Sequence, residues 1–123
     1  MRYAIAAAAA LSLSSPAEAT IGLLCKPSGG VGPQVGIVFG AGADGGIAAV
    51  NLKEGAAWRS SYRKEDRLVL TRSRLQRSLV RADFLDEKHP IRQGRLEVRI
   101  SGHTALGTFS LNGRRWAVRC VQD

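Results

Sequence analysis

The sequence predicts an all-β fold, either a small antiparallel barrel of about eight strands or a sandwich. Three observations predict it. Apolar and polar residues alternate along many short segments, glycine-rich or charged turns separate these segments, and the two cysteines, Cys25 and Cys120, fall in the first and the last of them. Alternation of period two is typical of strands with one buried face, and closing such a sheet into a barrel removes its exposed edges. A chain of 123 residues, 45% of them hydrophobic, has room for one small domain and excludes large multidomain enzymes.

Residues 1–19 have the features of a secretory signal peptide. A positive start precedes an uncharged, alanine-rich run over residues 3–13, and Ala17 and Ala19 match the small-residue pattern of a cleavage site. The apolar run is shorter than the roughly 20 residues that span a bilayer. We therefore expect cleavage after Ala19, a single all-β domain over residues 20–123, and a location in the periplasm or outside the cell.

Export also sets the expectation for the cysteines. An oxidising compartment favours disulfides, and two cysteines allow one pairing, Cys25 with Cys120. The pair lacks the short spacing of a redox motif or of a zinc half-site. We expect a disulfide bond that joins the first strand to the last across the seam of the barrel.

The first three strands are predicted where apolar residues share one parity along the chain. These sets are Ile21, Leu23 and Cys25; Val35, Ile37 and Phe39; and Ala48, Val50 and Leu52. A turn-rich loop over residues 26–34 separates the first set from the second. Alternation continues over residues 58–63, and Leu68 with Leu70 indicates a further strand.

Residues 68–84 fit two structures. Leucines and an alanine stand at helical spacing among arginines, which predicts a short helix over residues 72–83 as the alternative. Val80, Ala82 and Phe84 also share one strand parity. Because the chain alternates on both sides of this segment, we favour strands here.

The last three strands have the clearest signals. Residues 105–111 and 114–121 flank Asn112-Gly113, which favours a two-residue type I′ hairpin turn. Residues 95–100 alternate strictly, with the arginines and Glu97 directed outward. The hairpin register directs Ala105, Phe109, Leu111, Trp116, Val118 and Cys120 to the core and leaves Thr108, Ser110, Arg115 and Arg119 on the outer face.

No motif predicts catalysis, a cofactor or a metal. Residues 40–45 match G-x-G-x-x-G, but a dinucleotide site needs a helix after the glycines and the next segment is strand-like. Residues 61–64 match S-x-x-K without its partner motifs. The two histidines lack a third metal ligand, and the carboxylate pair Asp86-Glu87 fits a turn. We expect a protein that is not an enzyme, with a small hydrolase as a lesser alternative.

The most informative feature is an excess of arginine. The chain has 18 lysines and arginines against 10 acidic residues, a formal net charge of +8. Guanidinium groups suit carboxylate, sulfate and phosphate, and no nucleic-acid recognition motif is present, so we expect an anionic protein, glycan or lipid of the cell envelope as partner. The oligomeric state stays open. The candidate binding residues are Trp58, Arg59, Tyr62, Arg63, Lys64, Arg67, Arg72, Arg74, Arg77 and Arg81.

In architecture alone, the expected protein resembles the small periplasmic barrels that inhibit lysozymes or secreted proteases. Export, a short all-β chain and one disulfide near the chain ends carry this resemblance. The S-G-x-x-Y motif of lysozyme-inhibitor barrels is absent, because Ser101-Gly102 is followed by residues 103–105 with the sequence His-Thr-Ala. The resemblance implies enzyme inhibition as the alternative function, through a loop such as residues 26–34, and transfers no site residues.

Overall fold

The computed structural model describes residues 21–40 and 46–122, and strands form most of this part of the chain. The strands are β1 (Ile21–Pro27), β2 (Gln34–Phe39), β3 (Ile47–Glu54), β4 (Ala57–Ser60), β5 (Leu68–Gln76), β6 (Leu79–Asp86), β7 (Arg92–Ser101), β8 (Thr104–Leu111) and β9 (Arg114–Gln122). A single 3-10 turn, η3 (Lys64–Asp66), is the helical element among the described residues. Within the same residues, no helix is long and apolar enough to cross a bilayer. The expected all-β class is confirmed, whereas the predicted signal peptide and most of the glycine motif lie outside the described residues.

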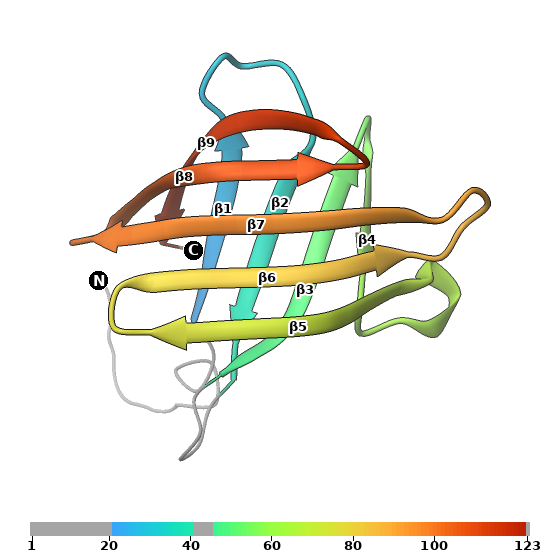
Figure 1. Ribbon diagram of the computed structural model, residues 1–123, viewed down its shortest axis with the longest axis horizontal. Helices are drawn as coiled ribbons and strands as arrows, with labels where there is room; N and C mark the ends of the chain where they lie inside the picture. Colours follow the sequence, from blue (N-terminus) through green and yellow to red (C-terminus); the bar gives the residue numbers. More distant parts are fainter. Residues whose placement is uncertain (1–20, 41–45, 123) are drawn as a thin grey trace, which may run out of the picture.

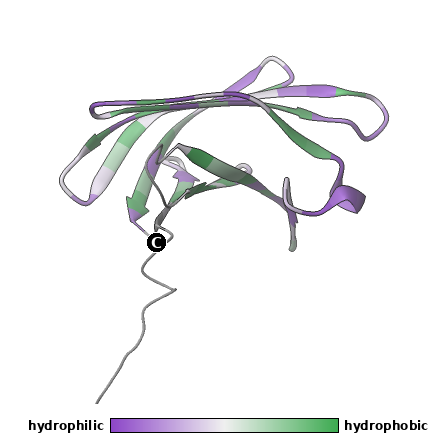
Figure 2. Ribbon diagram, turned by 90° about the horizontal axis from the view of Figure 1, so that it is seen from below, coloured by the Kyte–Doolittle hydropathy of each residue, from purple (hydrophilic) through white to green (hydrophobic). Residues whose placement is uncertain are grey.

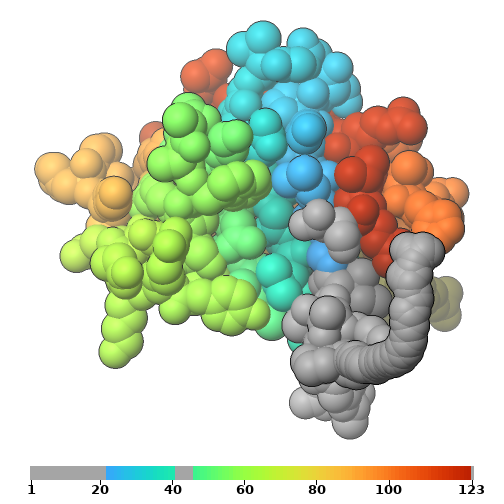
Figure 3. Space-filling view, turned by 180° about the vertical axis from the view of Figure 1, so that it is seen from behind, coloured from blue at the N-terminus to red at the C-terminus, as the bar shows by residue number. Residues whose placement is uncertain are grey.

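The strands form one antiparallel sheet that curls into a nearly closed barrel. The order of this 9-stranded sheet is β4-β3-β2-β1-β9-β8-β7-β6-β5, so β4 and β5 are its two edges. In Figure 1, β5 to β8 cross in front of the layer formed by β1 to β4. Figure 2 shows the two layers edge-on, with hydrophilic and hydrophobic segments alternating along the strands. Seen from behind, the blue and cyan β1–β2 region lies between the green β3–β4 region and the red last strand (Figure 3).

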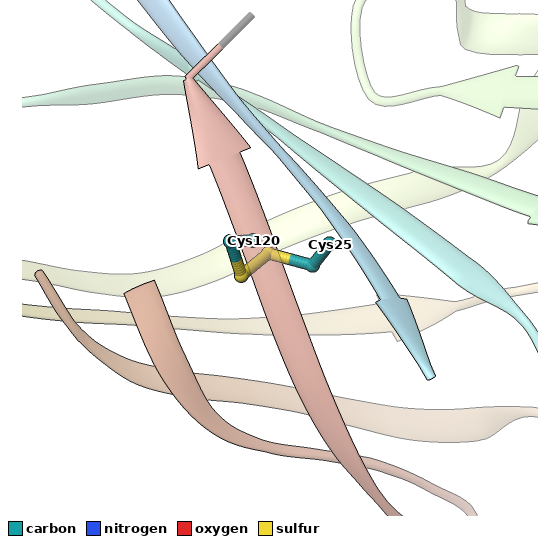
Figure 4. Close-up of a disulfide and its surroundings, with 2 residues drawn as sticks. All are labelled: Cys25 and Cys120. Carbon is teal, nitrogen blue, oxygen red and sulfur yellow. A yellow bond between two sulfur atoms is a disulfide. The ribbon is translucent and has the colours of Figure 1, made fainter. Parts of the chain in front are cut away.

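The first and last strands pair, and a disulfide bond joins them. Cys25 lies opposite Cys120 in the β1–β9 ladder, and their sulfur atoms are bonded at 2.06 Å across a sequence separation of 95 (Figure 4). Both cysteines are buried in the core. The expected pairing of these cysteines is confirmed. The sheet is continuous at this point, however, and its open seam lies instead between β4 and β5.

Residues 72–83 belong to strands, so the helical alternative is wrong. β5 and β6 form a hairpin, and β6 also pairs with β7. Val80, Ala82 and Phe84 on β6 are fully buried, whereas Leu75 on β5 is 41% exposed. β6 lies between two strands that satisfy its backbone groups, and its strand period of two points Val80, Ala82 and Phe84 to the core. In a helix, Ala82 would point away from the side shared by Val80 and Phe84.

A β-bulge breaks one predicted parity. Val50 and Leu52 are buried as expected, but Ala48 is exposed. Val38 pairs with Ala49 but Phe39 pairs with Ile47, because Ala48 is inserted at a register shift in the β2–β3 ladder. An inserted residue reverses the side-chain direction beyond it, so Ile47 packs against the core in place of Ala48.

The C-terminal hairpin has the predicted register. Asn112 and Gly113 have φ angles of 52° and 91°, as a type I′ turn requires. Phe109 lies opposite Trp116, and their ring centroids are 5.9 Å apart. The ring of Phe109 also stacks on that of Phe84, at a centroid distance of 6.1 Å. These stacked rings form the centre of the core, and five of the six residues predicted to point inward from this hairpin are buried there, while Trp116 packs against them partly exposed.

Replacing Cys25 and Cys120 by serine should lower the free energy of unfolding by about 4 kcal/mol, because the bond closes a loop on the order of 100 residues in the unfolded chain. Urea unfolding followed by tryptophan fluorescence measures the loss, and wild-type protein in reducing buffer is the control. Free-thiol titration of the native protein should find no reactive thiol. Two reactive thiols, or an unchanged urea midpoint in the double variant, would contradict this role.

Candidate functional site: an arginine-rich sheet face

The outer side of β5 to β9 gathers arginines from distant parts of the sequence. Directly opposed residues of antiparallel strands point to the same side of a sheet. By this rule Arg72, Asp83 and Arg95 form one cross-strand row, and parallel rows lie beside it. We call this surface the arginine face; its charged members are Arg72, Arg74, Arg81, Asp83, Arg95, Glu97, Arg99, Arg115 and Arg119. Seven arginines thus share it with two carboxylates.

One carboxylate, Asp83, serves two of these arginines. Arg95 Nε lies 2.8 Å from Asp83 Oδ1, and Arg81 reaches Oδ2 at 3.5 Å. Partial burial would raise the pKa of Asp83, but the hydrogen bonds from Arg95 and Arg81 outweigh it and lower that pKa. Among the described residues, five arginines of the face have no carboxylate within ion-pair distance: Arg72, Arg74, Arg99, Arg115 and Arg119.

Arg59, the first basic candidate in the chain, binds a buried carboxylate. Asp86 is 1% exposed, and the two terminal nitrogens of Arg59 donate to its oxygens at 2.9 and 2.6 Å. Arg92 donates to the same carboxylate and binds Glu54 at 2.7 and 2.9 Å. We call these four residues, from β4, β6, β7 and β3, the Asp86 clamp. It joins the two layers across the open seam, where no backbone ladder connects β4 to β5.

The clamp fixes the charge of each of its members. Burial alone would raise the pKa of Asp86, but the hydrogen bonds from Arg59 and Arg92 outweigh burial and hold this pKa far below its usual range. The hydrogen bond from Arg92 likewise lowers the pKa of Glu54. The pKa of Arg92 is raised in turn by its bonds to Glu54 and Asp86. All four groups are therefore charged at neutral pH, and their charges compensate one another.

Three further basic candidates lie in the connection from β4 to β5. Arg63 Nε donates to Asp66 at 2.9 Å, and Arg67 Nε donates to the carbonyl oxygen of Glu87 at 3.3 Å. Lys64 is exposed. Together these basic residues border a shallow cavity of about 410 Å³ beside the seam, so they form a second basic cluster, separate from the arginine face.

The remaining candidates also lie outside the arginine face. Trp58 belongs to β4 and is 38% exposed, with the ammonium of Lys53 5.9 Å from its ring. Tyr62 follows β4 and is 62% exposed. Arg77 lies at the tip of the β5–β6 hairpin with a φ of 55°. The structure therefore divides the basic stretch of residues 59–81 into separate groups.

The candidates found from the sequence include three of the seven arginines of the arginine face and, of the clamp, Arg59 alone. The outward parity of Arg95, Arg99, Arg115 and Arg119 was visible, but only the cross-strand register joins them to residues from β5. Asp86 was expected in a turn, which is wrong, because it ends β6 and is buried. Its parity matches that of Val80, Ala82 and Phe84, so a charge on the inward side of a strand was the available signal.

Comparisons with known proteins add no relative to this picture. No family model, no curated protein and no solved structure matches the chain. Within residues 21–40 and 46–122, no group of three or more His, Cys, Asp or Glu side chains could hold a metal ion.

Replacing Asp86 by asparagine should lower the free energy of unfolding by about 3 kcal/mol, because it leaves the partly buried Arg59 without its counter-charge and removes one of the two carboxylates that bind Arg92. Asp83→Asn is the matched control, since it also removes an arginine-paired aspartate from β6, but on the outer face, where the loss should stay below about 1 kcal/mol. Chemical denaturation measures both. Equal losses in the two variants would contradict the role of the clamp.

Stability should fall as the pH drops below about 4, the usual pKa of an aspartate in an unfolded chain. Because the folded-state pKa of Asp86 is lower, its contribution is complete above that value and is lost as the pH falls through the folded-state pKa. Asp86→Asn should remove this part of the acid dependence, while Glu54, Asp66 and Asp83, whose pKa values are also lowered, retain theirs. Urea unfolding at neutral and acidic pH tests this, and an unchanged acid dependence would count against it.

Proposed function

We propose that the protein is an exported, non-enzymatic binding protein whose arginine face binds an anionic partner of the cell envelope. The observation that carries this proposal is the set of five arginines that lack a carboxylate partner in the described part of the chain. Arg74 even lies opposite Arg81 in the β5–β6 ladder. Like charges in directly opposed positions destabilise a sheet, so an anionic partner would relieve a cost that the free protein carries.

The distribution of the acidic residues supports the same conclusion. Glu54 and Asp86 are engaged in the clamp, and Asp66 is engaged by Arg63 in the β4–β5 connection. Of the acidic residues that the structure describes, Asp83 and Glu97 lie on the arginine face. The seven arginines of the face therefore outnumber its two carboxylates, and this excess of positive charge on one outer side of the barrel attracts anions.

The spacing of the free arginines supports a partner with several negative groups. They lie on β5, β7 and β9, a width of about 20 Å measured along the sheet. Planar guanidinium groups bind carboxylate, sulfate and phosphate oxygens through paired hydrogen bonds. Export is supported by the disulfide bond, which oxidising compartments favour.

A second candidate function, inhibition of a lysozyme or a secreted protease, is supported by the β1–β2 loop. The loop protrudes at the top of Figure 3, and Val31 in it is 83% exposed. Its base is held in place, because Ser28 N–H donates to the Ala117 carbonyl at 2.8 Å and Gly32 packs tightly against Trp116. A preorganised loop with an apolar tip loses little entropy on entering a cleft.

Salt dependence separates the two candidates. Binding through the arginine face should weaken as salt rises, because exposed charges are screened over about 8 Å at physiological ionic strength. Binding through the loop should resist salt and should be abolished by Val31→Asp. The measurement is capture of envelope components at low and high salt by the wild-type protein and this variant; salt-resistant capture that requires Val31 would favour the inhibitor.

Replacing Arg74, Arg99 and Arg119 together by serine should weaken binding to immobilised heparin about thirtyfold, because each exposed charge contact contributes roughly 0.7 kcal/mol. The variant should elute at lower salt, with a melting temperature close to that of the wild type, since all three side chains are exposed. A lowered melting temperature with unchanged retention would mean that the arginines serve the fold by covering apolar surface.

The matched control replaces three exposed or partly exposed lysines outside the arginine face by serine: Lys53, Lys64 and Lys88. Both triple variants lose the same formal charge. The lysine variant should keep most of the heparin affinity. An equal loss in the two variants would mean that net charge alone governs retention, and would overturn the proposed face.

A further inference from the structure

A groove of about 680 Å³ lies at one end of the arginine face, over the ends of β5 to β8. Its floor is closed from below, because a Cβ atom at Gly94 would lie 2.2 Å from the ring of Phe84, which therefore fills the interior directly beneath the strand. The groove is thus a surface site and does not lead into the core. The polar side chains that line it include Arg72, Asp83, Gln93, Arg95, Ser110 and Asn112.

One arginine of the groove is fixed and the other is free to bind. Arg95 holds Asp83 through two nitrogens, at 2.8 and 3.3 Å, so its guanidinium plane is oriented before any ligand arrives. Arg72 lies opposite Asp83 in the ladder, but no ion pair is formed by Arg72 with any described carboxylate. Two guanidinium groups therefore border one concave site, one held by an ion pair and the other without one.

A β-bulge positions the free arginine. The β5–β6 register shifts between Leu70 and Arg72, so Thr71 is the inserted residue, and its hydroxyl donates to the Asp83 carbonyl at 3.0 Å. Bulges redirect side chains and are common beside binding sites. Here the bulge sets the direction of Arg72 at the border of the groove.

We propose that this groove binds a carboxylate-bearing sugar unit, such as a uronic acid residue of a glycan. This inference rests on the proposed function and names its ligand class. Arg72 supplies the uncompensated charge for a carboxylate beside Arg95, which Asp83 holds in place, while the amides of Gln93 and Asn112 and the hydroxyl of Ser110 supply donors and acceptors for sugar hydroxyl groups.

The other partner classes fit the groove less well. A lipid chain requires a mainly apolar lining, whereas Phe84 and Leu85 are the large apolar residues of this one. A protein partner buries a broad patch on the order of 800 Å² on each side, whereas this groove is concave and has the volume of a small-ligand site. The combination of charge, amides and a hydroxyl in a small concavity favours an acidic sugar.

The test titrates the protein with trigalacturonate and follows backbone amide shifts by NMR, with maltotriose as the neutral sugar of equal length. Trigalacturonate should shift the amides of Gln93, Gly94 and Arg95 and of residues 110–113, and maltotriose should not. No shift at millimolar trigalacturonate, or equal shifts with maltotriose, would overturn the proposal.

Two variants of one strand form the matched pair. Arg72→Gln and Arg74→Gln remove the same charge from exposed outward positions two residues apart on β5, but only Arg72 lines the groove. Arg72→Gln should raise the trigalacturonate dissociation constant about tenfold, the usual effect of losing a charge-assisted hydrogen bond, and Arg74→Gln less than about twofold. Equal effects would overturn the groove.

The heparin experiment distinguishes a failure of the groove proposal from a failure of the proposed function. If Arg72→Gln and Arg74→Gln weaken trigalacturonate binding equally while the arginine triple variant still loses heparin retention, the groove is wrong and the anionic partner of the face stands. If the triple variant retains heparin as the wild type does, the proposed face is wrong, whatever trigalacturonate does.

Discussion

The buried charge of Asp86 is the constraint on which the rest of the structure depends. A nine-stranded sheet that closes on itself everywhere except between β4 and β5 has to hold that seam without a backbone ladder. Arg59 and Arg92 supply the missing connection through side chains and satisfy a carboxylate that could not remain ionised inside the protein alone. By fixing the end of β6, the clamp also sets where the β5–β6 hairpin lies over the barrel.

Holding the seam in this way has an effect on the outer surface. Glu54 and Asp86 point toward the seam, where they bind Arg59 and Arg92. These two carboxylates are therefore not available to neutralise other arginines. The arginines on the opposite parity of β5, β7 and β9 keep their charge facing solvent. Arginine therefore has two roles in this protein. In the seam its charge is compensated by carboxylates, and on the arginine face most of its charge is not.

The fold was predictable where local chemistry decides it. The turn at Asn112-Gly113 and the alternation around it gave the C-terminal register, and the two cysteines allowed one pairing. The exposure of Ala48 was not predictable, because it follows from a bulge in the β2–β3 ladder. The clamp around Asp86 and the groove beside Arg72 depend on which distant strands become neighbours and on where the sheet stays open. The spacing of residues along the sequence does not determine either of these.

The mid-chain position of the open seam has a consequence for folding. Read from edge to edge, the sheet is a meander in which consecutive strands are joined by short turns, except that β1 and β9 meet through a pairing of sequence separation 95. Of all the strand pairings, this one closes the longest loop, so it costs the most loop-closure entropy and raises the contact order of the molecule. A circular permutant that links the native ends by a short turn and opens the chain between β4 and β5 would have only local strand pairings, and should reach the same barrel faster.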